Sequence, residues 1–63
     1  MNIHNCPIDV GDLIVDCDPY KAPEAWLGYG IVLEVLNSDY VAVHWINLDV
    51  VGAINVGNIE VVN

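Results

Sequence analysis

Residues 31–45 read Ile31-Val32-Leu33-Glu34-Val35-Leu36-Asn37-Ser38-Asp39-Tyr40-Val41-Ala42-Val43-His44-Trp45. Two runs rich in β-branched and aromatic residues flank the polar triplet Asn37-Ser38-Asp39, and a triplet of this kind favours a turn. This pattern predicts a β-hairpin, and Gly28-Tyr29-Gly30 marks the entry into its first strand.

Side chains alternate between the two faces of a strand, so a period-two pattern assigns the hairpin residues to an inner and an outer face. We expect the inner face to carry Ile31, Leu33, Val35, Val41, Val43 and Trp45. The outer face would then carry Val32, Glu34, Leu36, Ala42 and His44. This outer face is less polar than a solvated face usually is, and a shift of one residue would exchange the two faces.

Three other segments also predict short strands. They cover residues 11–16, 53–56 and 59–62, and Gly57-Asn58 breaks the chain between the last two. Their alternation directs inward the side chains of Ile54, Val56, Ile59 and Val61. The connection over residues 46–52 is predicted to be looser.

A long loop is predicted between the first two strands, because residues 17–27 contain two prolines. Pro23-Glu24-Ala25-Trp26 favours one helical turn with proline in its first position. The chain as a whole predicts an all-β fold of five strands in one domain over residues 1–63, with a lead over 1–10 and strands over 11–62. Because a two-sheet sandwich needs roughly 100 residues, a small, partly open barrel is the better match.

The composition combines many apolar residues with a strong negative charge. Apolar residues make up 56% of the chain, whose net charge is −8 and whose single Lys or Arg is Lys21. A domain this small buries only roughly 60% of its unfolded surface, so apolar surface remains for a partner. We expect no direct binding to nucleic acid, since phosphate backbones are bound through clusters of Lys and Arg.

The carboxylates are scattered rather than gathered in one run. They belong to Asp9, Asp12, Asp16, Asp18, Glu24, Glu34, Asp39, Asp49 and Glu60. They either keep an apolar chain soluble, or form an acidic face that meets a basic protein patch or imitates nucleic acid. The start of the chain lacks a secretory signal and no apolar run is long enough to span a membrane, so we expect a location in a cytoplasm or a virion.

No catalytic or cofactor-binding motif is recognisable, so we expect neither enzymatic activity nor a cofactor. The one candidate metal set is His4, Cys6, Cys17 and His44, of which only the first two are close in sequence. Zinc sites usually use two close pairs, so we expect no metal. Cys6 and Cys17 are expected to be reduced, and a bond between them would add about 3 kcal/mol of stability.

Two sets of residues are candidates for contact with a partner. The aromatic and acidic set comprises Tyr20, Trp26, Tyr29, Tyr40, Trp45, Asp18 and Glu24. These aromatic residues either plug the ends of the barrel, line a peptide groove or form a cage for a methylated cation. The apolar set comprises Val32, Leu36, Ala42, Val50 and Val51, and exposed apolar patches of this kind usually mark protein contacts.

Four segments of the chain can be compared with a known class of small barrels. They are Gly11-Asp12-Leu13-Ile14-Val15, Gly28-Tyr29-Gly30-Ile31-Val32-Leu33-Glu34-Val35, Val41-Ala42-Val43-His44-Trp45 and Ile59-Glu60-Val61-Val62. In this succession the chain resembles the Src-homology-3-like small barrels. Among these, the chain is most similar to the short stand-alone barrels often encoded by bacteriophages, which are related to KOW and Tudor modules. In such folds the long first loop and the strand ends flank a groove for proline-rich peptides. KOW-type binders of nucleic acid are basic, so the resemblance does not imply that activity here.

We therefore expect a non-enzymatic module for protein–protein interaction or assembly, which docks onto copies of itself or a larger protein. A capsid or tail subunit of a virion is one setting that the resemblance implies. The alternative is an acidic protein that binds and modulates a host protein. A regulator that binds a small ligand or a metal is a third hypothesis.

Overall fold

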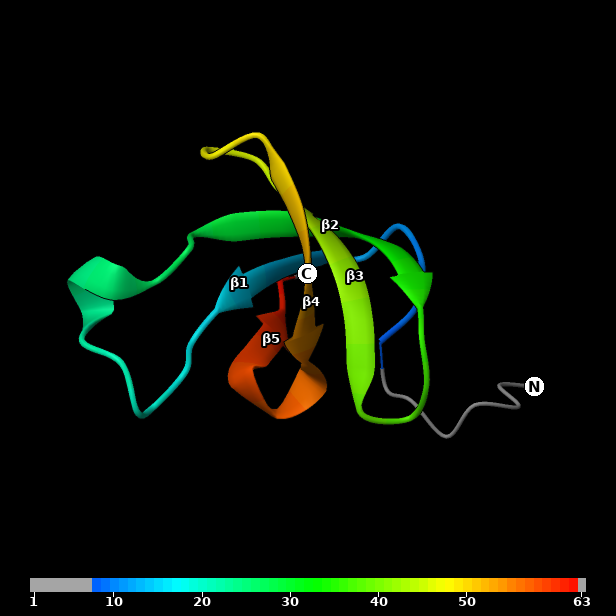
Figure 1. The fold of residues 1–63 in the computed structure, drawn as a ribbon, viewed down its shortest axis with the longest axis horizontal. Coiled ribbons are helices and arrows are strands. Elements are labelled where there is room, and N and C mark those ends of the chain that lie inside the picture. The colour runs from blue at the N-terminus through cyan, green and yellow to red at the C-terminus, as the bar shows by residue number, and fades with distance from the viewer. Residues whose placement is uncertain (1–7, 63) are drawn as a thin grey trace.

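The computed structural model of the chain describes residues 8–62 and arranges them as one antiparallel sheet of five strands (Figure 1). The strands are β1 (Leu13–Asp16), β2 (Tyr29–Val35), β3 (Tyr40–Trp45), β4 (Val50–Asn55) and β5 (Ile59–Val61). Two single 3-10 turns, η1 (Pro23–Ala25) and η2 (Val56–Asn58), are the only helical elements in this part of the chain. The expected helical turn that begins at Pro23 is η1, with proline at its start.

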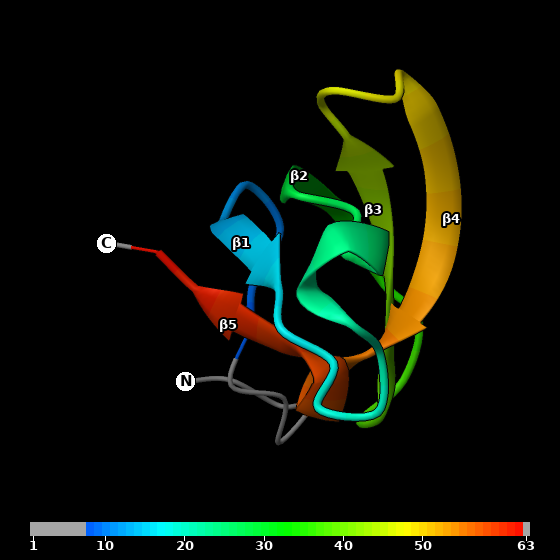
Figure 2. The same ribbon diagram turned by 90° about the vertical axis from the view of Figure 1, so that its left-hand side faces the viewer.

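The strand order is β4-β3-β2-β1-β5, so the sheet has two edges and is not closed. The short turn η2 links the two edge strands and leads the chain back to β1, which pairs with β5 (Figure 2). The sheet therefore curls around one side, where the core lies. The expectation of an all-β, five-stranded, partly open architecture is confirmed.

The turn between β2 and β3 forms because of the chemistry of Asn37. Its side-chain oxygen accepts hydrogen bonds from the backbone nitrogens of Asp39, at 2.8 Å, and Tyr40, at 2.9 Å. An Asn side chain that bonds to the backbone two residues later stabilises a turn of this kind. The hairpin predicted over residues 31–45 is therefore confirmed.

The register of β2 shifts by one residue at a β-bulge. Val32 pairs with Val43, but the next pair joins Glu34 to Ala42, which leaves Leu33 as the extra residue. As a result Val32 is 1% exposed and Leu33 is 47% exposed.

The bulge overturns part of the predicted face assignment. Ile31 pairs with His44, which lies between two buried residues of β3 and thus faces outward. The inner positions predicted for Ile31 and Leu33 are therefore wrong, as is the surface position predicted for Val32. Beyond the bulge the alternation resumes in the other phase, and Val35 pairs with the buried Val41 as expected.

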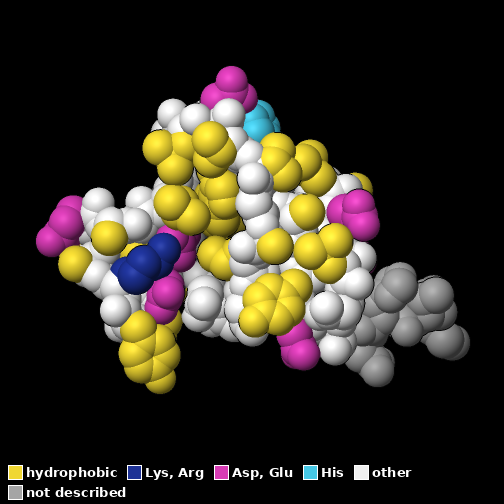
Figure 3. All heavy atoms as spheres, viewed as in Figure 1, with side chains coloured by type: hydrophobic (Ala, Val, Ile, Leu, Met, Phe, Trp, Pro, Cys, Tyr) yellow, Lys and Arg dark blue, Asp and Glu magenta, His cyan; other side chains and the backbone are white. Residues whose placement is uncertain are grey.

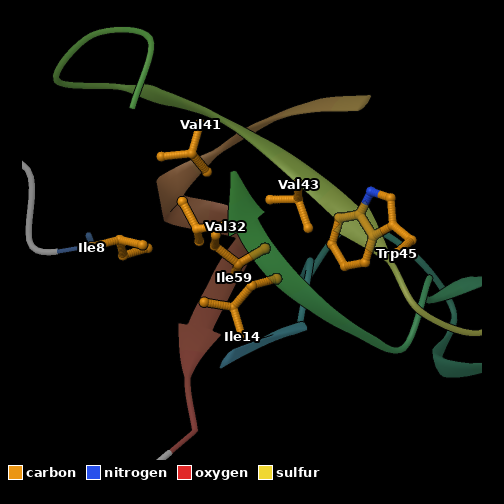
Figure 4. Close-up of a cluster of buried hydrophobic side chains, with 7 residues drawn as sticks. All are labelled: Ile8, Ile14, Val32, Val41, Val43, Trp45 and Ile59. Carbon is orange, nitrogen blue, oxygen red and sulfur yellow. The ribbon is translucent and has the colours of Figure 1, made fainter. Parts of the chain in front are cut away.

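The core is a small cluster of apolar side chains from four of the strands and the segment before β1 (Figure 4). Its buried members are Ile8, Ile14, Val32, Val41, Val43, Trp45 and Ile59. The inward prediction for Val41, Val43 and Trp45 is confirmed. Half-buried side chains pack against this cluster, and they include Leu27, Val35, Ile54, Val56 and Val61.

The chain after β3 is more regular than its sequence predicted. Residues 46–49 form a turn, and β4 begins directly after it at Val50, so a looser connection over 50–52 was the wrong prediction. Asp49 closes the turn with a left-handed φ of 52°, a conformation that aspartate tolerates better than most residues. Each residue from Val50 to Asn55 then pairs with a residue of β3.

The bulge can be tested with a matched pair of variants in adjacent positions. Val32→Ala is expected to lower the free energy of unfolding by about 2 kcal/mol, because it removes buried methyl groups and leaves a cavity. Leu33→Ala is expected to change the same free energy by less than about 0.5 kcal/mol, since the side chain is largely in solvent. Denaturant unfolding monitored by tryptophan fluorescence measures both, and a larger loss at Leu33 would restore the uninterrupted period-two pattern.

Candidate functional site

The long loop between β1 and β2 is anchored by a buried carboxylate, Asp16. This residue is 0% exposed, and its oxygens accept hydrogen bonds from Lys21 Nζ at 2.8 Å, Leu27 N at 2.9 Å and Asp18 N at 3.2 Å. The bonds reach the start, the middle and the end of the loop, so one side chain fixes its path. Sequence reasoning missed this role, although an aspartate that ends an apolar strand shortly before the chain's only lysine was a usable signal.

The anchor keeps Asp16 ionised. Burial alone raises the pKa of this carboxyl, but the hydrogen bonds from Lys21 and from the Leu27 and Asp18 backbone, together with the Lys21 charge, outweigh that effect. The net result is a pKa below the ordinary value for aspartate. The partly exposed Lys21 thus neutralises the buried charge of Asp16.

The loop presents two of the predicted aromatic residues. Tyr20 is 95% exposed, whereas Trp26 lies partly against the loop and donates its indole N–H to the Asp18 carbonyl at 3.0 Å. The Asp18 carboxylate accepts the backbone N–H of Tyr20 at 2.9 Å, which forms a local turn. Glu24 is exposed on η1. These four residues share one projecting loop, which lies on the left in Figure 1.

The other three predicted aromatic residues lie elsewhere. Trp45 is 2% exposed and belongs to the core, so its assignment to a binding groove is wrong. Tyr29 pairs with Val15 at one end of β2, while Tyr40 lies at the far end of β3 and pairs with Asn55. Since a strand rises about 3.3 Å per residue, the start of β3 is roughly 17 Å from its end. The seven residues therefore do not line one groove, and no pocket is found among residues 8–62.

The predicted apolar surface is also divided by the fold. Val32 is in the core, as described above, and cannot contribute to a surface. Val50 and Val51 lie at the start of β4, beside the turn, whereas Leu36 lies beyond the opposite end of β3. Ala42 is half-buried on the outer face between them. Only Val50 and Val51 belong to a larger exposed group.

That group is the tip of the hairpin formed by β3 and β4. We define the apolar hairpin end as Ile46, Leu48, Val50 and Val51. Their side chains are between 47% and 63% exposed. Trp45 pairs with Gly30 on one side and with Val50 on the other, so the turn over residues 46–49 projects beyond the paired part of the sheet (Figure 1). Figure 3 shows hydrophobic side chains gathered around this projection.

An apolar row on the outer face continues from the hairpin end across the sheet. The pairing places Leu13, Ile31, His44 and Val51 side by side on four adjacent strands. His44 Nε2 lies 2.8 Å from Asp49 Oδ1, so the one imidazole of the row is held by the turn. Neither this pair nor the row was predicted from the sequence, because the bulge at Leu33 exchanges the faces of β2.

The surface charge is almost entirely negative. Asp16 is the buried carboxylate of the described residues, and the eight other acidic side chains of the chain are half-buried or exposed. Lys21, the only Lys or Arg, is bound to Asp16. Within residues 8–62 the only other contact of this kind joins the His44 imidazole to the Asp49 carboxylate. The outer surface therefore carries carboxylates with little cationic compensation.

The residues of the candidate metal set lie partly outside the described chain. His4 and Cys6 fall before residue 8, and no group of three metal-binding side chains occurs within 8–62. Cys17 carries a free thiol, whose pKa is raised by burial and by the charges of Glu60, Asp16 and Asp18. The same described range contains no helix long and apolar enough to cross a membrane.

The Asp16 anchor gives a specific dependence of stability on pH. The folded-state pKa lies below the unfolded one, so the stabilisation is complete above the unfolded pKa and is lost as the pH falls through the folded pKa. In thermal unfolding from neutral pH down to about pH 2, the wild type is expected to lose more stability than Asp16→Asn. At neutral pH, Asp16→Asn is expected to unfold at a lower temperature. Parallel pH profiles of the two proteins would contradict the anchor.

Comparison with known proteins identifies no relative: no family model, no curated protein and no solved structure matches the chain. The proposals below therefore rest on the residues of this chain.

Proposed function

We propose that the chain is a non-enzymatic module for protein–protein interaction or assembly, which docks through its apolar hairpin end. The observation that carries this proposal is the exposure of four apolar side chains, Ile46, Leu48, Val50 and Val51, in and beside the turn between β3 and β4. Single exposed apolar residues are normal on protein surfaces. Four of them within six consecutive residues, on a hairpin that no other strand covers, make a contact surface.

The two faces of the hairpin contribute together. Neighbouring residues of a strand point to opposite faces, so Val50 and Val51 present apolar surface on both sides. Burying such side chains in a partner contributes about 25 cal/mol for each Å² of apolar surface removed from water. A partner that encloses the hairpin end would gain from both faces at once, whereas a flat partner surface would cover only one.

The Src-homology-3-like resemblance is part of this proposal. It is supported by the small, open, five-stranded sheet and by the long loop between β1 and β2. The partner is a second copy of the chain or a larger protein, and the setting that the resemblance suggests is a phage virion.

A second candidate function is that of an acidic regulator of another protein. The eight carboxylates other than Asp16 favour it, because the only Lys or Arg of the chain is paired with Asp16 and leaves them without a cationic partner among Lys and Arg. A basic patch on a partner would then be attracted at long range, and the association would weaken as salt screens the charges.

Assembly through the hairpin end can be tested with one variant at each end of β3. We expect the wild type to form an oligomer at low and high salt, and Leu48→Glu to be a monomer, because a carboxylate in the contact would lose its hydration. Leu36→Glu, at the opposite end of β3, is expected to keep the wild-type mass. Static light scattering gives the mass, and circular dichroism checks that all three proteins stay folded.

Equal masses for the wild type and Leu48→Glu would exclude the hairpin end as the surface of self-assembly. A monomeric wild type at both salt concentrations would exclude self-assembly altogether. In that case the hairpin end would be reserved for a different protein.

A further inference from the structure

The outer edge of β4 carries backbone groups that no strand of the described chain pairs. Val56 N donates to Asp39 O, and Asp49 N donates to Trp45 O, each at 2.8 Å, which fixes the phase of the ladder between β3 and β4. Because bonded and non-bonded pairs alternate along an antiparallel ladder, Val50, Gly52 and Ile54 bond to β3. The N–H and C=O groups of Val51 and Ala53, and the N–H of Asn55, point away from the sheet, whereas the Asn55 carbonyl caps η2.

This edge lacks the devices that usually protect an edge strand. Natural edges are shortened, bulged or interrupted by proline or charge. The strand Val50–Asn55 has six residues, no proline and no charge, and its register with β3 is unbroken. The other edge strand, β5, has only three residues and contains Glu60. Figure 2 shows β4 along the outer margin of the fold, with no other segment beyond it.

We propose that the free edge of β4 binds an extended, basic segment of a partner protein as a sixth strand. The proposal rests on the protein-binding function proposed above. It adds which backbone groups of β4 make the contact and which class of partner they bind. In this mode of recognition the main chain supplies the hydrogen bonds, and alternate side chains supply the specificity. Val51, Ala53 and Asn55 would bond to the segment.

The charge of the chain selects a basic occupant. Asp49 precedes β4 with an exposed carboxylate, and the backbone of Asp39 lies beside Val56 at the other end of the strand. A second copy would bring no further Lys or Arg to these groups, because its Lys21 is paired with Asp16, whereas a segment with Lys or Arg would be attracted. Because β4 itself is uncharged, the segment needs apolar or small residues opposite the centre of the strand and basic ones around them.

The first experiment uses the full chain, isotope-labelled, and a short synthetic peptide that alternates valine and lysine. At low salt, the peptide is expected to slow amide hydrogen exchange at Val51, Ala53 and Asn55, because these N–H groups become hydrogen-bonded. A matched peptide that alternates valine and glutamate is expected to bind at least about tenfold more weakly. High salt is expected to weaken the binding of the lysine peptide, because it screens the attraction between the opposite charges.

A matched pair of variants separates backbone pairing from side-chain contact. Ala53→Pro removes one outward N–H and leaves the bonds to β3 in place, as proline does on edge strands. This variant is expected to bind the lysine peptide about tenfold more weakly than the wild type. Ala53→Thr changes the side chain but keeps the N–H, and it is expected to bind like the wild type. Circular dichroism checks the fold of both variants.

Three results would overturn the inference. The first is unchanged exchange at Val51, Ala53 and Asn55 with the lysine peptide, whether or not Ala53→Pro folds. The second is slowed exchange confined to residues 46–49, which would leave the proposed function intact and remove the edge from it. The third is protection of the same three amides in the absence of peptide, if this protection increases with protein concentration. That result would assign the edge to a second copy.

Discussion

The indole of Trp45 lies over the backbone of Gly30, and the packing of β2 against β3 at this end of the core depends on this contact. Trp45 and Gly30 are paired across β3 and β2. A Cβ atom at position 30 would run into the Val43 side chain and would stand 3.0 Å from the indole and 3.1 Å from the His44 carbonyl oxygen. Only glycine lets the two strands and the large ring occupy this space. The ring closes one end of the core, so the hairpin beyond it has no core to cover, and its apolar side chains face solvent.

A second constraint comes from placing an ion pair in so small a fold. A charge removed from water is tolerated only when it is paired and hydrogen-bonded, and Asp16 meets both conditions through Lys21 and two backbone N–H groups. The arrangement fixes the long loop, which carries no buried apolar residue of its own in η1. It also takes up the only Lys or Arg of the chain, Lys21, as the partner of Asp16. The ordered loop is therefore the result of this interaction, whereas the acidic surface follows from the eight other carboxylates of the chain.

Local chemistry made much of this fold predictable, and long-range packing made the rest unpredictable. The turn at Asn37, the 3-10 turn at Pro23 and the inner face of β3 follow from side-chain hydrogen bonding, a fixed φ and alternation within a few residues. The bulge at Leu33 follows from no local signal, and it exchanged the faces of β2, so Val32 was assigned to the surface. The aromatic groove failed for a different reason: alternation already placed Trp45 in the core, and the distance between Tyr29 and Tyr40 depends on the register of β2 and β3. The start of β4 at Val50 was missed because it is set by pairing with β3, and no local pattern in residues 46–52 reveals that pairing.

The hairpin end and the free edge belong to the same strand, and this proximity bears on how a partner would bind. Each backbone hydrogen bond formed along β4 contributes about 1 kcal/mol net, too little for a stable complex after the loss of translational freedom. Apolar contact at Val50 and Val51 adds binding energy beside the edge, at the end where Asp49 attracts a basic group. Charge then favours encounter, backbone pairing sets the direction of the segment, and apolar burial slows its release. Because a second copy has no Lys or Arg other than the one paired with Asp16, the edge of β4 favours a basic segment over the edge of another copy.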